Sequence, residues 1–352
     1  MIAAEHIRSV RDLAERIGRP VKLMEVCGTH TMAAFRSGLR SILPANVSLL
    51  SGPGCPVCVT PNGYLDLALA IAEQPDTVVA TFGDMVRVPG SRSSLEQARA
   101  RGARVRVVYS ALDALEEARR SPAVRVVFLG VGFETTVPGT AWAIKEAQGS
   151  VPNFFVLGAH KTMPRAMTVL LEGGKVQIDG FLCPGHVSVV IGSKPYEFIA
   201  REHGIPCVVT GFEPADLVAG IEMLLRQIAE KRSEVEIQYA RSVTREGNAK
   251  ARAAIEDVFE ESDAEWRGLG RIPGSGLDIR DDFARRDAAR AFAEIRVPAP
   301  SEPKGCRCGD VLRGACTPAE CPLFRRACTP DGPVGACMVS SEGTCAAYFK
   351  YS

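Results

Sequence analysis

Eight short apolar runs, rich in β-branched residues, recur along the first two thirds of the chain, and they limit the fold more than any other feature. The runs are mostly continuous rather than alternating, which is typical of strands covered on both faces in a parallel sheet. Helical stretches such as residues 62–74 and 214–232 separate them. The sequence therefore predicts an α/β protein whose strands occupy residues 21–26, 47–51, 77–82, 104–109, 124–130, 154–158, 178–183 and 207–211.

The 352 residues exceed the size of one ordinary core, so we expect more than one domain. The rhythm of strands and helices predicts two tandem parallel-sheet α/β domains, residues 1–115 and 116–232. The pattern then changes, and residues 233–352 are expected to hold a mixed segment followed by a small cysteine-rich module. In that segment, residues 248–262 are typical of a helix and residues 268–277 of a loop.

Seven of the twelve cysteines lie in residues 306–345, which indicates a metal-binding module. An odd number cannot all pair as disulfides, and the N-terminal residues show no apolar secretory segment, so a reducing, cytoplasmic location is expected. Thiolates stay available as ligands there. The spacing matches no ferredoxin or zinc-ribbon pattern. An iron-sulfur cluster is favoured because spare thiols suit redox chemistry, with zinc or disulfides as alternatives. The seven are Cys306, Cys308, Cys316, Cys321, Cys328, Cys337 and Cys345.

Charge and hydropathy argue against two classes of partner. Lys and Arg number 42 against 41 Asp and Glu, so no net positive field attracts nucleic acid. The most apolar run, residues 126–144, contains Glu134 and several glycines and prolines, which argues against a membrane-spanning helix. With 46% hydrophobic and 24% charged residues, the composition is that of a soluble globular protein.

Cys27 and His30 follow the first predicted strand in the motif CGTH. Ligands bind at the carboxyl ends of strands in open α/β sheets, because loops and helix N-termini converge there. Helical N–H groups beyond Cys27 would favour its thiolate, which makes it a candidate nucleophile or soft metal ligand. His30 lies within one helical turn and is a candidate co-ligand or proton shuttle. A buried structural cysteine with a capping histidine is the alternative.

Cys55 and Cys58 form a C-x-x-C pair in SGPGCPVCVTP, directly after the second predicted strand. This spacing allows the chain to turn and bring the two sulfurs into bonding range, so the pair is a candidate redox dithiol. Structural metal binding is the second interpretation. It ranks below the redox dithiol because no further C-x-x-C pair or neighbouring histidine is present to complete a zinc site. Inert core thiols are the third.

Glu134 in GFETT, His160 in GAHK and His186 in CPGHVS also follow predicted strands. The Gly-x-Gly opening at residues 130–132 lacks the third glycine of a dinucleotide fingerprint, so a nucleotide cofactor gains little support. Taken singly, such residues are more often structural. Together they predict that the second sheet supplies proton-transfer or hydrogen-bonding groups facing Cys27.

A series of motifs resembles the hydrogenase maturation factor HypD family: CGTH, GPGCPVCVTP, GFETT, CPGHVS, GFEP and REGN, then the tail VLRGACTPAECPLF, CTP and GACMVSSEGTCAAY. The resemblance extends from Cys27 to Tyr348, in the same order. It implies two related α/β domains and a C-terminal module holding a 4Fe-4S cluster. It also implies a scaffold for the Fe(CN)2CO group of nickel-iron hydrogenases, working with the small chaperone HypC and the cyanide carrier HypE, and indirectly with the hydrogenase large subunit.

The resemblance also implies roles for individual residues. Cys27 would hold the transient iron that carries cyanide and carbonyl, and Cys55 and Cys58 would be the redox dithiol. The cluster ligands would be Cys321, Cys328, Cys337 and Cys345. Roles for Cys306 and Cys308 are not implied, and Cys183, Cys207 and Cys316 are expected to be incidental. His160 is left out of the site, because Met163-Pro164-Arg165 stands where the family has Pro-Pro.

Three thiol groups in one chain predict an electron relay from the cluster through the dithiol to iron at Cys27. The main alternative is an iron-sulfur-dependent thiol-disulfide oxidoreductase that acts on a protein substrate, which would not need Cys27. A structural metal protein that docks partners through its tail is a third hypothesis.

Overall fold

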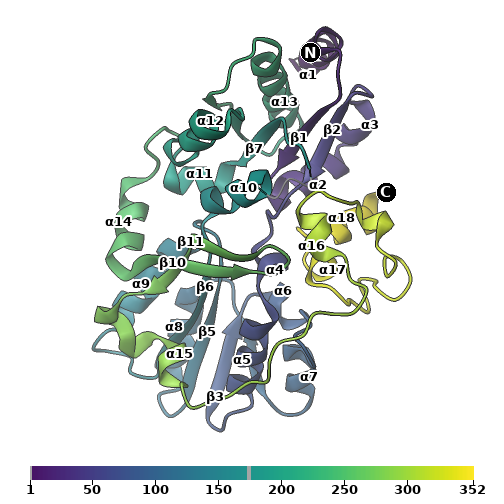
Figure 1. The fold of residues 1–352 in the computed structure, drawn as a ribbon. Helices are drawn as coiled ribbons and strands as arrows, with labels where there is room; N and C mark the ends of the chain where they lie inside the picture. Colours follow the sequence, from purple (N-terminus) through teal and green to yellow (C-terminus); the bar gives the residue numbers. More distant parts are fainter. Residues whose placement is uncertain (1, 173–175) are drawn as a thin grey trace.

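The computed structural model describes residues 2–172 and 176–352, and it contains two parallel β-sheets (Figure 1). All eight apolar runs supply a strand, which confirms the predicted α/β class. Sheet A has the order β2 (Val47–Ser51), β1 (Val21–Glu25), β7 (Gly180–Pro184), β8 (Cys207–Thr210), β9 (Val235–Ile237). Sheet B has the order β4 (Arg104–Val107), β3 (Thr77–Thr81), β5 (Arg125–Gly132), β6 (Phe154–His160).

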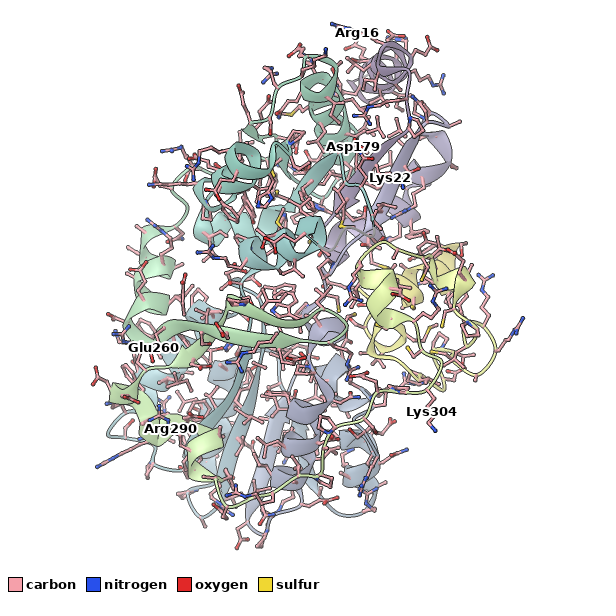
Figure 2. The ribbon with its side chains drawn as sticks, in the orientation of Figure 1. Arg16, Lys22, Asp179, Glu260, Arg290 and Lys304 are labelled. Carbon is pink, nitrogen blue, oxygen red and sulfur yellow. The ribbon has the colours of Figure 1, made fainter. Side chains whose placement is uncertain are left out.

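The two sheets do not follow one another along the chain. Sheet A takes β1 and β2 from before sheet B and β7, β8 and β9 from after it, with Leu23 paired to Gly180. Lys22 donates its backbone N–H to the Asp179 carboxylate, 2.8 Å away, where these distant segments meet (Figure 2). The expected division at residues 115/116 therefore does not coincide with a sheet boundary. Apolar runs reveal a buried strand but not its partner.

The chain crosses from sheet A to sheet B after β2 and back after β6. Helices cover both faces of each sheet. The first crossing contains the C-x-x-C pair. The helices are α1 (Ile2–Ile17), α2 (Gly28–Arg36), α3 (Leu39–Ile42), α4 (Pro56–Val59), α5 (Asn62–Ala72), α6 (Gly83–Val86), α7 (Leu95–Ala100), α8 (Ala111–Arg120), α9 (Val137–Ala147), α10 (Met163–Glu172), α11 (Gly185–Ile191), η1 (Lys194–Tyr196), α12 (Glu197–His203) and α13 (Pro214–Ala229). Beyond sheet A follow α14 (Ala249–Val258), η2 (Asp281–Arg286), α15 (Ala288–Ala291), α16 (Cys308–Leu312), η3 (Pro318–Glu320), α17 (Ala336–Val339) and α18 (Thr344–Tyr351). After β9 the chain thus returns to sheet B, where α14 packs on α9 and α15 on β6.

A β-hairpin lies between the sheets in Figure 1, where the sequence predicted the end of a helix and a loop. Its strands are β10 (Phe259–Trp266) and β11 (Gly270–Ile279). The helix prediction over residues 248–262 was wrong for its last four residues, and the loop prediction over residues 268–277 was wrong for most of its length. Buried Ile272 and Leu277 anchor β11 despite its glycines, because pairing with β10 supplies the backbone hydrogen bonds.

The cysteine-rich tail packs against sheet A's α2 and the first crossing's α4 (Figure 1). Phe35 and Tyr348 meet edge to face at 4.7 Å between ring centroids, and the Arg40 guanidinium lies over both rings. Arg87 donates to the Pro330 carbonyl oxygen, which links the tail to the sheet B side as well. The tail thus contacts both halves of the molecule. No helix within residues 2–172 and 176–352 has the length and apolar character needed to cross a membrane.

Candidate functional site

Cys27 lies just beyond β1, which ends at Glu25, and it is the N-cap residue of α2, so it follows the first strand as the sequence predicted. Its backbone is extended, and the Gly28 N–H donates to the Gly54 carbonyl oxygen at 3.0 Å. A Cβ on Gly54 would lie 2.2 Å from the Cys27 nitrogen, so only glycine allows this approach. Burial raises the pKa of the Cys27 thiol to about 11, although the His30 and Thr29 N–H groups oppose this shift. Cys27 is therefore a shielded thiol that needs a compensating charge, such as a metal ion, to ionise.

Glu342 from the tail reaches the same loop, which sequence reasoning missed. The Thr29 hydroxyl donates to Glu342 Oε1 at 2.7 Å, and Gly28, next to Cys27, packs directly against Glu342. The carboxylate is close enough to oppose ionisation of Cys27 and to favour protonation of His186. An acidic residue between two tail cysteines was the only sequence signal for this contact.

His30 and His186 lie around one aromatic ring, that of Phe212. The ring centroids of His186 and Phe212 are 3.8 Å apart, and those of His30 and Phe212 are 4.9 Å apart. His30 Nε2 lies 3.0 Å from the Thr210 carbonyl oxygen, to which it donates as the neutral tautomer. Burial lowers the pKa of His30 to about 4, so the ring is neutral near pH 7. Both predicted histidines belong to sheet A's edge, together with Cys27.

The dithiol Cys55 and Cys58 lies at the start of the first crossing, buried beside the tail. Cys55 caps α4 by accepting a hydrogen bond from the Cys58 N–H at 3.2 Å. Burial opposes ionisation of Cys58, but hydrogen bonds from Cys337 and Cys55 and the nearby Arg267 charge lower its pKa overall. Burial raises the pKa of Cys55. One thiol of the pair is thus the better nucleophile, as redox C-x-x-C pairs require.

Six of the seven tail cysteines line one small cavity together with apolar side chains. Cys337 is the innermost contact point, since its sulfur lies 2.8 Å from that of Cys308 and also interacts with Cys345 and Cys58. Cys316 lines a separate surface pocket. Among the described residues, no three Cys, His, Asp or Glu side chains are grouped to hold a single metal ion. The six lining cysteines are Cys306, Cys308, Cys321, Cys328, Cys337 and Cys345.

Glu134 and His160 lie on sheet B, away from the thiols. Glu134 lines a cavity of about 740 Å³ whose wall contains none of the cysteines, and it accepts a hydrogen bond from the Met163 N–H at 2.9 Å. Burial raises the pKa of Glu134 to about 7 and lowers that of His160 to about 3. The structure therefore brings together Cys27, His30, His186 and the dithiol, but not Glu134.

Comparison with known proteins gives consistent matches along the chain. The family model HypD, described as "Hydrogenase formation hypA family", matches residues 1–352. A "Hydrogenase maturation factor HypD" of Cupriavidus necator is 50% identical, with 99% of this chain and 93% of the relative covered. Proteins with the same description from Rhodobacter capsulatus and Escherichia coli (strain K12) are each 48% identical, with 98% and 99% of this chain and 94% of each relative covered.

Proposed function

The chain belongs to the HypD family, and from that premise we propose that it acts in hydrogenase maturation as a scaffold for the Fe(CN)2CO group. Cys27 holds the iron cargo in this proposal. The observation that carries the proposal is a chain of thiols, because Cys337 at the tail cavity interacts with Cys58. The Gly54 carbonyl oxygen next to Cys55 in turn accepts the Gly28 N–H beside Cys27.

Cys27 suits a low-valent iron that carries cyanide and carbonyl. A thiolate is a soft ligand, and burial at this edge excludes water. Because burial disfavours the free thiolate, iron binding and loss of the thiol proton are coupled. Neutral His30 already donates its one ring proton to the Thr210 carbonyl oxygen, so partly exposed His186 is the histidine left to donate a hydrogen bond to cyanide on the iron.

The tail cavity fits an iron-sulfur cluster, because its wall offers thiols and apolar groups without carboxylates or imidazoles. A 4Fe-4S cluster takes four ligands, and six are present. The sulfurs of Cys337 and Cys308 are adjacent, and Cys337 also interacts with Cys58 of the first dithiol. We therefore assign Cys308 and Cys337 to a second dithiol. The ligands are then Cys306, Cys321, Cys328 and Cys345, with Cys306 in place of the sequence-predicted Cys337.

A bound cluster would supply single electrons to the adjacent thiols. Reduction of a Cys55–Cys58 disulfide takes two electrons and two protons and yields the dithiol, and Cys337 is the group placed to exchange electrons with Cys58. Oxidation of the dithiol back to the Cys55–Cys58 disulfide releases two electrons and two protons, and in this proposal the electrons pass to the iron cargo at Cys27. The proposed partners follow from the family: HypC sharing the iron, HypE delivering cyanide, and the hydrogenase large subunit as recipient.

Complementation tests this proposal against a thiol-disulfide oxidoreductase. Variants are produced in cells whose own HypD gene is deleted, and hydrogenase activity and iron content are measured. Cys55→Ser should retain cluster iron yet lose hydrogenase maturation, and Cys27→Ala should do the same. Cys207→Ala, a buried thiol in β8, serves as the control and should mature hydrogenase. Normal maturation with Cys27→Ala would favour the oxidoreductase instead.

A further inference from the structure

The turn between α17 and α18, residues 340–343, contacts both thiol-bearing loops of the first α/β region. At one end, the Ser340 hydroxyl donates to Asp84 Oδ2 at 2.8 Å and interacts with the Cys55 thiol. At the other end, Glu342 accepts the hydrogen bond of Thr29 at 2.7 Å. The turn therefore connects the dithiol loop to the Cys27 loop.

The same turn is held tightly by the tail's own cysteines. It lies between Cys337 and Cys345, both of which line the thiol cavity. A Cβ on Gly343 would lie 2.2 Å from the Cys337 carbonyl oxygen, so the turn packs against the backbone of α17. Because metal binding and local folding are coupled in such modules, the order of this turn depends on the thiols around it.

The contact between the turn and the Cys27 loop is also sterically specific. A Cβ on Gly28 would lie 2.5 Å from Glu342 Cβ and 2.7 Å from its carbonyl oxygen. Neither distance is tolerated between non-bonded heavy atoms, so the glycine of CGTH is required for the tail to approach. Hydrogen bonding and close packing thus act at the same point.

We propose that Glu342 is a positioning residue through which the metal-loaded tail fixes the loop that bears Cys27. This inference rests on the proposed function, in which Cys27 is the thiol that binds the iron cargo. Loading the tail orders residues 340–343, and Glu342 then holds Thr29 by its hydrogen bond and Gly28 by close packing, which fixes the backbone that carries Cys27. Cargo iron is accepted only by a protein whose tail is already assembled.

The test measures alkylation of Cys27 by iodoacetamide in the full-length protein, quantified on the Cys27 peptide by mass spectrometry. Anaerobic metal-loaded and chelator-treated samples are compared. In the loaded protein, Glu342→Ala should speed alkylation about tenfold, because a hydrogen bond to a charged acceptor is lost. Gly28→Ala should act in the same direction by steric exclusion. Glu320→Ala is the control. Glu320 is a tail carboxylate that accepts a hydrogen bond from the Thr317 N–H, so its loss should leave the alkylation rate of Cys27 unchanged.

Glu342→Gln separates positioning from charge. The amide oxygen still accepts the Thr29 hydrogen bond, so the rate should stay within about threefold of wild type. A Gln variant as fast as the Ala variant would show that the negative charge alone slows Cys27, which overturns the proposal. A wild-type rate in loaded Glu342→Ala, or no change on chelation, overturns it as well. Failure of the proposed function would appear separately, as complementation by Cys27→Ala with the alkylation pattern intact.

Discussion

Polar residues follow strands at the carboxyl edges of both sheets, yet only sheet A's edge assembles a candidate site. There Cys27, His30 and His186 are joined by Glu342 from the tail. At sheet B's edge, Glu134 lines a cavity without cysteines. His160 is buried against Phe259 of the hairpin. The difference lies in what covers each edge, since the tail brings thiols and a carboxylate to the sheet A side, whereas the hairpin brings Phe259, Glu260, Glu261 and Leu277, but no thiol, to the Glu134 cavity.

The comparison teaches that strand-end position alone does not make a site. At sheet A, Gly54 allows the dithiol loop to approach the Cys27 backbone, and Gly28 allows Glu342 of the cysteine-rich tail to pack against the same loop. Buried polar atoms without a hydrogen-bond partner among the described residues occur at both edges, Glu134 Oε2 and His160 Nδ1 at sheet B and His30 Nδ1 at sheet A, so they do not distinguish the two. Residues 132–136 resemble a site in sequence, but the described residues that line the cavity at Glu134 include none from the cysteine-rich tail.

The largest expected effect is on the iron content of the cysteine-rich tail, the segment that covers sheet A's edge. Cys328→Ser should remove most of the cluster iron and destabilise the tail, because metal binding and folding are coupled there. Cys316→Ser, outside the thiol cavity, should retain wild-type iron. Iron and sulfide assays on anaerobically purified variants measure both. Equal iron in the two proteins would remove Cys328 from the ligand set.

The same assay decides between Cys306 and Cys337 as fourth ligand, and iron loss with Cys337→Ser alone would reverse our assignment.

Glycine substitutions give the next effect, on stability. Gly54→Ala places a Cβ 2.2 Å from the Cys27 backbone nitrogen, and we expect it to lower the free energy of unfolding by about 2–4 kcal/mol. Gly158→Ala, on β6 of sheet B, meets no atom within 4 Å and should change it by less than about 1 kcal/mol. Urea unfolding of both variants checks the contrast. Equal stability losses would mean that the close approach of Gly54 to the Cys27 backbone does not require glycine.

The smallest expected effect is the pH dependence that Glu134 contributes at sheet B. Burial raises its pKa from 4.5 to about 7. Between these values the folded state keeps a proton that the unfolded state releases, so the stabilisation is complete below pH 4.5 and is lost as pH rises to 7. Glu134→Gln should therefore gain about 1–3 kcal/mol over wild type at pH 8 relative to pH 4.5.

Urea unfolding at several pH values measures this difference. The lowered pKa of His30 acts with the opposite sign, since stability rises with pH between about 4 and 6.5, but it is present in both proteins and cancels. A difference between Glu134→Gln and wild type that does not change with pH would show that Glu134 titrates normally.

Much of the fold follows from the sequence, because short, continuous apolar runs rich in β-branched residues favour buried strands over helices. The pairing of these strands does not follow, because β1 pairs with β7, a strand far along the chain, with Leu23 opposite Gly180. Cys27, His30 and His186 were predictable from their places after strands. Glu342 was not predictable, because its contact with Thr29 exists only when the tail packs against the Cys27 loop. The interaction of Cys337 with Cys58 was not predictable either, because the family motif gives no information on which thiols meet in space.

An infrared spectrum tests the central claim most directly. The protein is purified without oxygen from cells that also produce HypC, and iron and sulfide are assayed to confirm an intact tail. The account predicts cyanide and carbonyl stretching bands in the wild type and their loss in Cys27→Ala, with iron in the tail unchanged. Absence of the bands from the wild type, or their persistence in Cys27→Ala, would contradict it.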